Sequence, residues 1–209
     1  MAEPELIADE AVGVEILESD VAFRGHVWDI RTEKFAYNGG TLTRDFVDHT
    51  GAVAIVGLDD RDRVLLIKQY RHPIRHRDWE IPAGLLDIAG EPPLLAAQRE
   101  LAEEADLVAD RWNVLADYVN SPGGSNEALR IYLARGVAPT EQPFARTEEE
   151  ADMETRWVDL DEVVDGVLSR RLQNSALAIG ALAAHTARAR GWSSLGAAEE
   201  PWTRHPQHR

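Results

Sequence analysis

Three glutamates lie at spacings of three and four residues in one segment of this 209-residue sequence. Glu100, Glu103 and Glu104 would occupy neighbouring positions on one face of a helix. Like charges at these positions repel one another, whereas converging carboxylate oxygens suit a hard divalent cation such as Mg²⁺ or Mn²⁺. A solvated acidic face in an acidic protein would carry the same residues, so the cluster alone leaves both interpretations open.

The sequence is strongly acidic, so an anionic substrate would need a cation to bind. The chain has 22 Lys and Arg residues against 37 Asp and Glu residues, a formal net charge of −15 at pH 7. Such a protein repels polyanions, which argues against a general binder of nucleic acid or of anionic membranes. If the substrate carries phosphate, a divalent cation can neutralise the acidic surface locally.

Cysteine is absent from the sequence, which excludes disulfides, thiol nucleophiles and zinc–thiolate sites. No apolar stretch reaches the roughly 18 residues of a membrane helix, so we expect no membrane span. The first 20 residues are acidic and lack the basic-then-apolar order of a signal peptide. We therefore expect a cytoplasmic protein with no membrane partner.

The glutamates are predicted to lie on a helix that Pro92 and Pro93 open, because a residue without an N–H costs nothing in the first turn. Before it, the continuous apolar run at 51–58 is typical of a buried strand, and a strand at 64–70 would complete a hairpin. A short extended piece at 79–82 leads toward the helix.

The residues after this helix predict a mixture of strands and helices, followed by a polar tail from Gly191 that we expect to be frayed. An acidic, irregular loop is expected at 139–150. Few regular β-α-β units occur, which predicts an α/β fold whose mixed sheet lies between helices. The expected strands are 112–119, 128–134 and 155–159, and the expected helices are 161–171 and 175–188.

The N-terminal residues predict a separate antiparallel β arm. Residues 21–30 and 41–47 are expected to be strands, and the turn-forming Asn38-Gly39-Gly40 lies between them. We therefore divide the chain into a β arm at 1–48, a main domain at 49–190 and a flexible tail at 191–209.

The segment from Gly84 to Leu107, GLLDIAGEPPLLAAQRELAEEADL, resembles the Nudix box, G-x5-E-x7-R-E-U-x-E-E-x-G-U, in which U is aliphatic. Glu91, seven further residues and then RELAEE match without a gap. The segment departs from the box in two ways. Six residues instead of five separate Gly84 from Glu91, and Asp106 stands at the position of the second glycine. That position follows the helix, where a positive φ is common, and aspartate tolerates it better than most residues.

The resemblance implies a Nudix fold, an α/β/α sandwich with a mixed sheet, and a hydrolase that uses Mg²⁺ or Mn²⁺. About two or three ions per active site would bridge a diphosphate and orient the attacking water. Arg99 and Glu91 match a structural pair that holds the loop on the helix. The metal-ligand positions that the resemblance implies are Glu100, Glu104, the outer ligand Glu103 and the backbone carbonyl of Ala83.

Features outside the box resemble the ADP-ribose pyrophosphatase branch of this family. They are WEIPAG at 79–84, SPGGSNE at 121–127 with its proline 15 residues beyond Leu107, and QNSALAIGALAA from Gln173. The branch implies hydrolysis of ADP-ribose to AMP and ribose 5-phosphate. It also implies a homodimer in which the N-terminal arms complete each other's sites.

In this branch the general base lies on the loop before the last strand, where the chain reads Thr147-Glu148-Glu149-Glu150. We take Glu150 as the base and Glu149 as the second choice, since a loop that closes over substrate can deliver a base. The alternative is that these three glutamates are solvated charge.

The resemblance also implies positions that contact the substrate. Arg71 matches an arginine that binds the diphosphate, and Arg44 matches an arm residue that reaches the nucleotide from the partner subunit. Glu127 matches a position that holds the terminal ribose hydroxyls, and the backbone of Leu85 would line the pocket. Either arginine could instead be an ordinary surface residue. Trp28 could stack on adenine, although a core tryptophan is the more frequent case.

Two alternative functions remain at this level. The same chemistry could act on another nucleoside diphosphate conjugate, such as an NDP-sugar, NADH or FAD. A non-catalytic Nudix module that senses a ligand is the alternative of another class. All three box glutamates are present and no basic helix-turn-helix follows them, which favours the enzyme.

Overall fold

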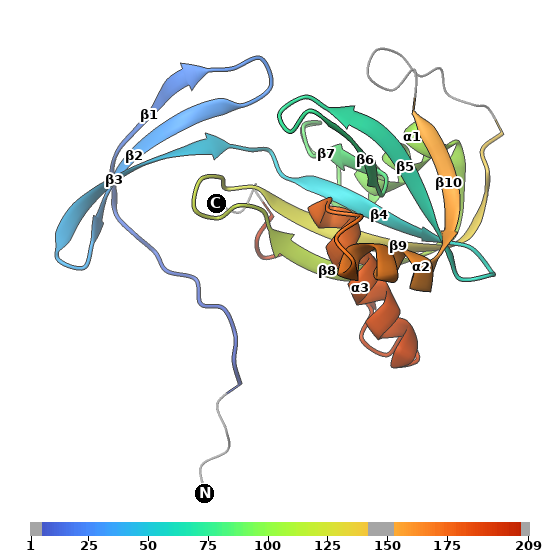
Figure 1. The fold of residues 1–209 in the computed structure, drawn as a ribbon. Coiled ribbons are helices and arrows are strands. Elements are labelled where there is room, and N and C mark those ends of the chain that lie inside the picture. Colours follow the sequence, from blue (N-terminus) through green and yellow to red (C-terminus); the bar gives the residue numbers. More distant parts are fainter. Residues whose placement is uncertain (1–5, 142–152, 206–209) are drawn as a thin grey trace, which may run out of the picture. The chain divides into compact units, whose positions relative to one another are not determined.

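The computed structural model describes residues 6–141 and 153–205, which divide into two compact units. The first unit is the N-terminal part up to His49 together with Gly123–Ser125, and the second unit is the remainder. Figure 1 shows the elements of each unit. Among the helices of the described residues, none is long and apolar enough to cross a membrane.

The first unit is an antiparallel three-stranded sheet in the order β1-β2-β3. Its strands are β1 (Ile16–Arg24), β2 (Asp29–Tyr37) and β3 (Gly40–Asp48). Asn38 and Gly39 join β2 to β3 with positive φ angles of 50° and 75°. A two-residue hairpin of type I′ needs positive φ at both positions, so the predicted turn at Asn-Gly is confirmed.

The prediction of one strand over 21–30 is wrong, because β1 ends at Arg24 and β2 begins at Asp29. The chain turns tightly between them: a Cβ at Gly25 would lie 2.1 Å from the carbonyl oxygen of Trp28. The sequence did not predict this turn, because Val27 and Trp28 are residue types that favour strands.

The second unit is built on a sheet in the order β10-β5-β4-β9-β8-β11, with β6 paired to β5 and β7 to β4. β4 and β9 are parallel and the other pairs are antiparallel, so the predicted mixed sheet is confirmed. The strands are β4 (Ala52–Leu58), β5 (Arg63–Arg71), β6 (His76–Glu80), β7 (Ala83–Leu85), β8 (Leu107–Val119), β9 (Ala128–Pro139), β10 (Glu154–Asp159) and β11 (Gly196–Ala197).

Helices cover both faces of this sheet, as an α/β/α sandwich requires (Figure 1). Alternate residues of β4 serve opposite faces: Val53 and Ile55 pack with α1 (Pro93–Ala105), whereas Ala54 and Val56 pack toward α3 (Ser175–Ala189). α2 (Leu160–Leu168) lies on the α3 face. Burial on both faces explains why β4 is a continuous apolar run.

Several element boundaries differ from the predicted ones. β8 begins at Leu107 and β9 continues to Pro139, because these two residues pair and extend the ladder beyond the apolar core. α2 ends at Leu168, where the Ser169 hydroxyl donates to the carbonyl oxygen of Asp165 and Arg170 adopts a φ of 65°.

The C-terminal segment as far as His205 is packed against the rest of the second unit, in contrast to the frayed tail expected from Gly191. β11 pairs with β8, and Trp202 is only 6% exposed. Trp192 and Leu195 also pack against the main core. These scattered apolar side chains anchor a segment whose average polarity is high.

Candidate active site

α1 carries the three box glutamates, and its two ends are set by local sequence. Pro92 is the N-cap and Pro93 begins the helix, as predicted. The C-cap is Asp106, with φ 55° and ψ 37°, and its N–H donates to the carbonyl oxygen of Ala102 at 3.0 Å. Aspartate therefore adopts the left-handed conformation that the box normally assigns to glycine, as the sequence argument expected.

Glu104 points inward from α1 and is 5% exposed. Its Oε2 accepts a hydrogen bond of 2.9 Å from the backbone N–H of Ala83, the first residue of β7. A buried carboxylate needs hydrogen bonds or a cation, because loss of hydration is costly. Glu104 is thus fixed beside the backbone segment that the sequence predicts to share a metal site.

Glu100 also lies against β7, where a glycine makes room for it. A Cβ built on Gly84 would lie 2.0 Å from the carboxyl carbon and from Oε1 of Glu100. Any residue with a side chain at this position would displace the carboxylate. The first glycine of the box therefore has a physical role here, which is to let Glu100 approach the β7 backbone.

Arg99 links the loop before α1 to the glutamates. Its Nε and Nη2 donate to both carboxylate oxygens of Glu91 at 3.0 and 2.9 Å, which confirms the predicted pair. Its Nη1 donates to Glu100 at 2.5 Å and to Glu103 at 3.1 Å. The hydrogen bonds between Arg99 and Glu91 lower the pKa of Glu91 and raise the pKa of Arg99.

The residues at β7 have the chemistry that a hard divalent cation needs. Glu100 and Glu104 supply carboxylate oxygens at one short strand, and the chain at Ala83 supplies a backbone carbonyl. Glu103 lies nearer to solvent: its side chain is 39% exposed and forms a salt bridge with Arg99. Within 6–141 and 153–205, no three acidic or histidine side chains already form a metal-binding cluster by themselves. The arrangement fits a site that a bound cation and a diphosphate would complete.

Arg71 lies at the end of β5, where a buried carboxylate orients it. Its Nε and Nη2 donate to Glu80 at 2.9 and 2.6 Å, and Gln69 donates to the same carboxylate at 3.2 Å. Glu80 is 2% exposed, whereas nearly half of the Arg71 side chain remains exposed. The guanidinium is thus held in a fixed position from which it can meet an anion.

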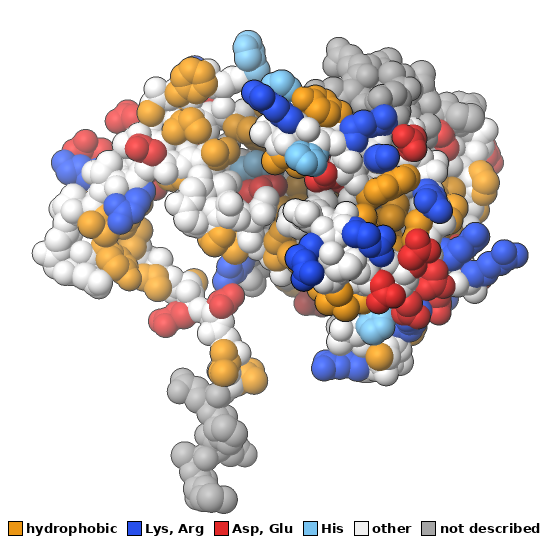
Figure 2. Space-filling view, viewed as in Figure 1, with side chains coloured by type: hydrophobic (Ala, Val, Ile, Leu, Met, Phe, Trp, Pro, Cys, Tyr) orange, Lys and Arg blue, Asp and Glu red, His pale blue; other side chains and the backbone are white. Residues whose placement is uncertain are grey.

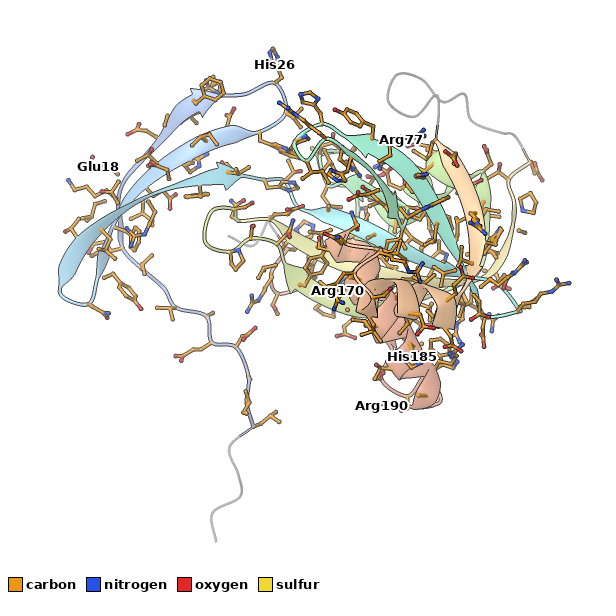
Figure 3. The ribbon with its side chains drawn as sticks, viewed as in Figure 1. Glu18, His26, Arg77, Arg170, His185 and Arg190 are labelled. Carbon is orange, nitrogen blue, oxygen red and sulfur yellow. The ribbon has the colours of Figure 1, made fainter. Side chains whose placement is uncertain are left out.

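The hairpin between β5 and β6 is a basic surface on an acidic protein. His72, Arg75, His76 and Arg77 are exposed there, next to Arg71. Figure 2 shows blue and pale-blue side chains gathered at this hairpin, and Figure 3 labels Arg77 on β6. His185 and Arg190, also labelled in Figure 3, belong to α3 and its end, on the opposite face of the sheet from α1.

A family model described as the NUDIX domain matches residues 48–177 of this chain. The chain belongs to the Nudix family. An ADP-ribose pyrophosphatase of Mycobacterium tuberculosis is 44% identical over 82% of this chain and 83% of its own length. A methanol dehydrogenase activator of Bacillus methanolicus is 30% identical, covering 78% of this chain and 88% of that protein.

Two further comparisons support the family and the fold. An ADP-ribose pyrophosphatase of Bacillus subtilis is 32% identical over 75% of this chain and 84% of its own length. A crystal structure of an ADP compounds hydrolase superposes with a TM-score of 0.73 at 20% identity, covering 88% of this chain and 99% of that one. The second of these bears on the fold alone, and it agrees with the Nudix sandwich described above.

The remaining expected site residues fall in both units of this Nudix protein. Glu127 is half-buried in the second unit and accepts a hydrogen bond of 2.8 Å from Asn120. Leu85 ends β7, half-buried and paired with Ala52. Arg44 is exposed on β3 of the first unit, where it donates to the carbonyl oxygen of Thr43.

Trp28 and the expected general base complete the list of predicted residues. Trp28 lies in the first unit, half-buried and stacked on His49 with ring centroids 3.9 Å apart, and it is not part of either buried core. Glu149 and Glu150 lie outside the described residues.

Glu80, the buried partner of Arg71, was not predicted from the sequence. A signal was present, since Glu80 is the single charged residue within the motif WEIPAG. A carboxylate that is buried with the apolar residues beside it needs a cationic partner. The identity of that partner depended on the pairing of β5 with β6, which sets Glu80 opposite Ile67 and therefore on the same face of the hairpin as Arg71.

Proposed function

We propose that this Nudix protein hydrolyses the diphosphate of ADP-ribose to AMP and ribose 5-phosphate, with Mg²⁺ or Mn²⁺ as cofactor. The observation that carries the proposal is the placement of Glu100 and Glu104 against β7, beside the glycine that makes room for one of them. The two relatives named ADP-ribose pyrophosphatase support the choice of substrate.

Glu100, Glu104 and the backbone carbonyl of Ala83 would hold the cations, with Glu103 as an outer ligand, at about two or three ions per active site. When bound, the cations neutralise the charge that develops on the diphosphate and lower the pKa of water. Arg99 contributes by position: its bonds to Glu91 and Glu100 fix the loop and one ligand relative to the helix.

The reaction adds one water molecule across the diphosphate. Glu150, with Glu149 as the second choice, would accept a proton from the water that attacks one phosphorus. The bridging oxygen then leaves with the other phosphate, so that the two products each carry one phosphate group. Glu127 would hold the ribose hydroxyls, and the backbone of Leu85 would line the pocket.

Arg71 would bind the diphosphate with a guanidinium that Glu80 has already oriented. Pre-orientation lowers the entropy lost when the anion binds. The surrounding basic hairpin would attract the anion toward a protein whose net charge is −15.

We also propose a homodimer that works in the cytoplasm. The first unit supports the dimer because this small unit exposes large apolar side chains, among them Phe23, Val27 and Tyr37. Such a surface is expected to be covered by a second copy. Arg44 would then reach the partner's nucleotide. The absence of cysteine from the whole sequence is consistent with a reducing compartment.

The decisive experiment measures hydrolysis of ADP-ribose, an NDP-sugar, NADH and FAD side by side, with product analysis. We expect ADP-ribose to give the highest kcat/KM, AMP and ribose 5-phosphate as products, and full loss of activity with EDTA that Mg²⁺ or Mn²⁺ restores. A higher kcat/KM for another conjugate would reassign the substrate. Binding of ADP-ribose without turnover at any metal concentration would favour a ligand-sensing module instead.

A further inference from the structure

Two hydrogen bonds between the same two residues close the base of the connection from β8 to β9. The backbone N–H of Asn120 donates to the carbonyl oxygen of Glu127 at 3.0 Å. The side-chain Nδ2 of Asn120 donates to Oε2 of Glu127 at 2.8 Å, and both residues are half-buried. These contacts come directly after Val119 and Ala128, the last residue pair of the β8–β9 ladder. Glu127 is therefore tied to Asn120 by its backbone and by its side chain.

The chain adopts an unfavourable backbone conformation directly after Asn120. Ser121 has a φ of 51°, in the left-handed region that residues with a side chain seldom adopt. Pro122 follows it, and a residue before proline prefers an extended backbone. A conformation of this kind persists only where the surrounding contacts impose it. The two hydrogen bonds between Asn120 and Glu127 are such contacts.

The side-chain hydrogen bond restricts the torsion of Glu127 that is otherwise least defined. The last torsion of a glutamate side chain is broad, so a carboxylate without a fixed contact rotates over a wide range. A carboxylate accepts hydrogen bonds and cannot donate them, so the atom of Asn120 that faces it is the amide nitrogen. The amide is neutral, so it orients Glu127 without cancelling its negative charge.

An oriented carboxylate suits a sugar that presents two neighbouring hydroxyl groups. The two oxygens of a carboxylate offer about four acceptor positions, and Asn120 occupies one of those of Glu127. Each sugar hydroxyl can donate a charge-assisted hydrogen bond, which is stronger than one between neutral groups. The orientation of the carboxylate determines whether both hydroxyls can be met at once.

We propose that Asn120 is a positioning residue that orients the carboxylate of Glu127 toward the hydroxyl groups of the terminal ribose. The inference rests on the proposed hydrolysis of ADP-ribose, in which Glu127 holds these hydroxyls. Asn120 acts through Glu127 and makes the affinity for the substrate depend on the presence of that sugar.

The test compares ADP-ribose with ADP, which has the same nucleoside and diphosphate but lacks the terminal ribose. Asn120→Ala should raise the KM for ADP-ribose about tenfold, the effect of losing one hydrogen bond to a charged group. The kcat should stay within about threefold of the wild-type value, because the ribose is held equally in the bound substrate and in the transition state. The Ki of ADP as a competitive inhibitor should stay within about twofold, since ADP has no group for Glu127.

Two results of this comparison would overturn the proposal. One is a wild-type KM for ADP-ribose in Asn120→Ala. The other is an equal rise in the KM for ADP-ribose and in the Ki of ADP, which would show that the substitution disturbs the whole site and not the ribose contact alone.

Two further variants separate positioning from a general loss of packing. Asn120→Asp keeps the size of the side chain but replaces the donor by a like charge, and should raise the KM at least as much as Asn120→Ala. Asn113→Ala is the matched control: Asn113 is half-buried on β8 and donates to the carbonyl oxygen of Gly196 at 3.1 Å. This control loses a side-chain hydrogen bond elsewhere and should keep the wild-type KM. A rise in KM as large as that of Asn120→Ala would overturn the proposal.

The wild-type rate separates a failure of this inference from a failure of the proposed function. A wild-type chain that does not hydrolyse ADP-ribose overturns both. Wild-type turnover together with a wild-type KM in Asn120→Ala overturns this inference alone.

A crystal structure of the unmodified chain with a non-hydrolysable analogue of ADP-ribose gives an independent answer if the variants fail to fold. We expect Nδ2 of Asn120 and a hydroxyl of the terminal ribose within hydrogen-bond distance of the same Glu127 carboxylate. Ribose hydroxyls held by another residue, or a Glu127 carboxylate turned away from Asn120, would overturn the proposal.

Discussion

Replacement of Gly84 by alanine tests whether the close approach of Glu100 to β7 is needed for catalysis. The new Cβ would lie 2.0 Å from the carboxyl group, which must move by about 1.4 Å to reach the 3.4 Å of ordinary contact. The displaced atoms are the end of a flexible side chain, so the free energy of unfolding should stay within about 1 kcal/mol of the wild-type value. A displacement of about 1 Å in a positioned catalytic group costs roughly 100-fold in rate.

The assay is ADP-ribose hydrolysis at several Mg²⁺ concentrations, together with thermal unfolding of the same samples. We expect kcat to fall about 100-fold in Gly84→Ala and half-maximal activity to need more Mg²⁺. Gly57→Ala is the matched control, because a Cβ there would lie 3.5 Å from Leu65, an ordinary contact. A Gly84→Ala protein with the kcat of the wild type, or one that loses several kcal/mol of stability, would refute this reasoning.

Four further substitutions test individual roles. Glu104→Gln removes a charged ligand and should lower kcat by several orders of magnitude in a folded protein, which circular dichroism and rate measurements check together. Glu150→Gln should lower kcat by about 10²–10⁴ with little change in substrate affinity; the same loss in Glu149→Gln instead would assign the base to that residue. Arg71→Lys keeps the charge but loses the two-pronged geometry and should raise KM about tenfold, whereas an unchanged KM would leave it a structural role. Glu91→Gln should destabilise the fold at pH 7 by about 1–3 kcal/mol. Because Arg99 lowers the pKa of Glu91 in the folded state, this difference should be present above the unfolded pKa of about 4.3 and disappear as the pH falls through the folded pKa; a pH-independent difference in denaturant midpoints would contradict the ion pair.

The parts of the fold that the sequence predicted well are those with a strong local signal. The apolar run of β4, the Pro-Pro start of α1 and the Asn-Gly turn each combine a distinct composition with one preferred backbone geometry. The break between β1 and β2 lacked such a signal, because Val27 and Trp28 favour strands and only Gly25 marked the turn.

The contacts of the candidate site could be predicted where the two residues are close in sequence. They could not be predicted where the pairing of strands determines which side chains meet. The pair of Arg99 with Glu91 and the left-handed Asp106 followed from the motif and its spacing. The pair of Arg71 with Glu80 required the β5–β6 register. The anchoring of the C-terminal segment by Arg130 required a contact across 70 residues, which local patterns do not reveal.

The central claim is that Glu100 and Glu104 bind the cations that act on the diphosphate. The most direct measurement is anomalous diffraction from crystals that contain Mn²⁺ and a non-hydrolysable analogue of ADP-ribose. The account predicts anomalous peaks within coordination distance of the carboxylate oxygens of Glu100 and Glu104 and of the carbonyl oxygen of Ala83, next to the diphosphate. Manganese bound elsewhere, or a diphosphate without metal at these carboxylates, would contradict it.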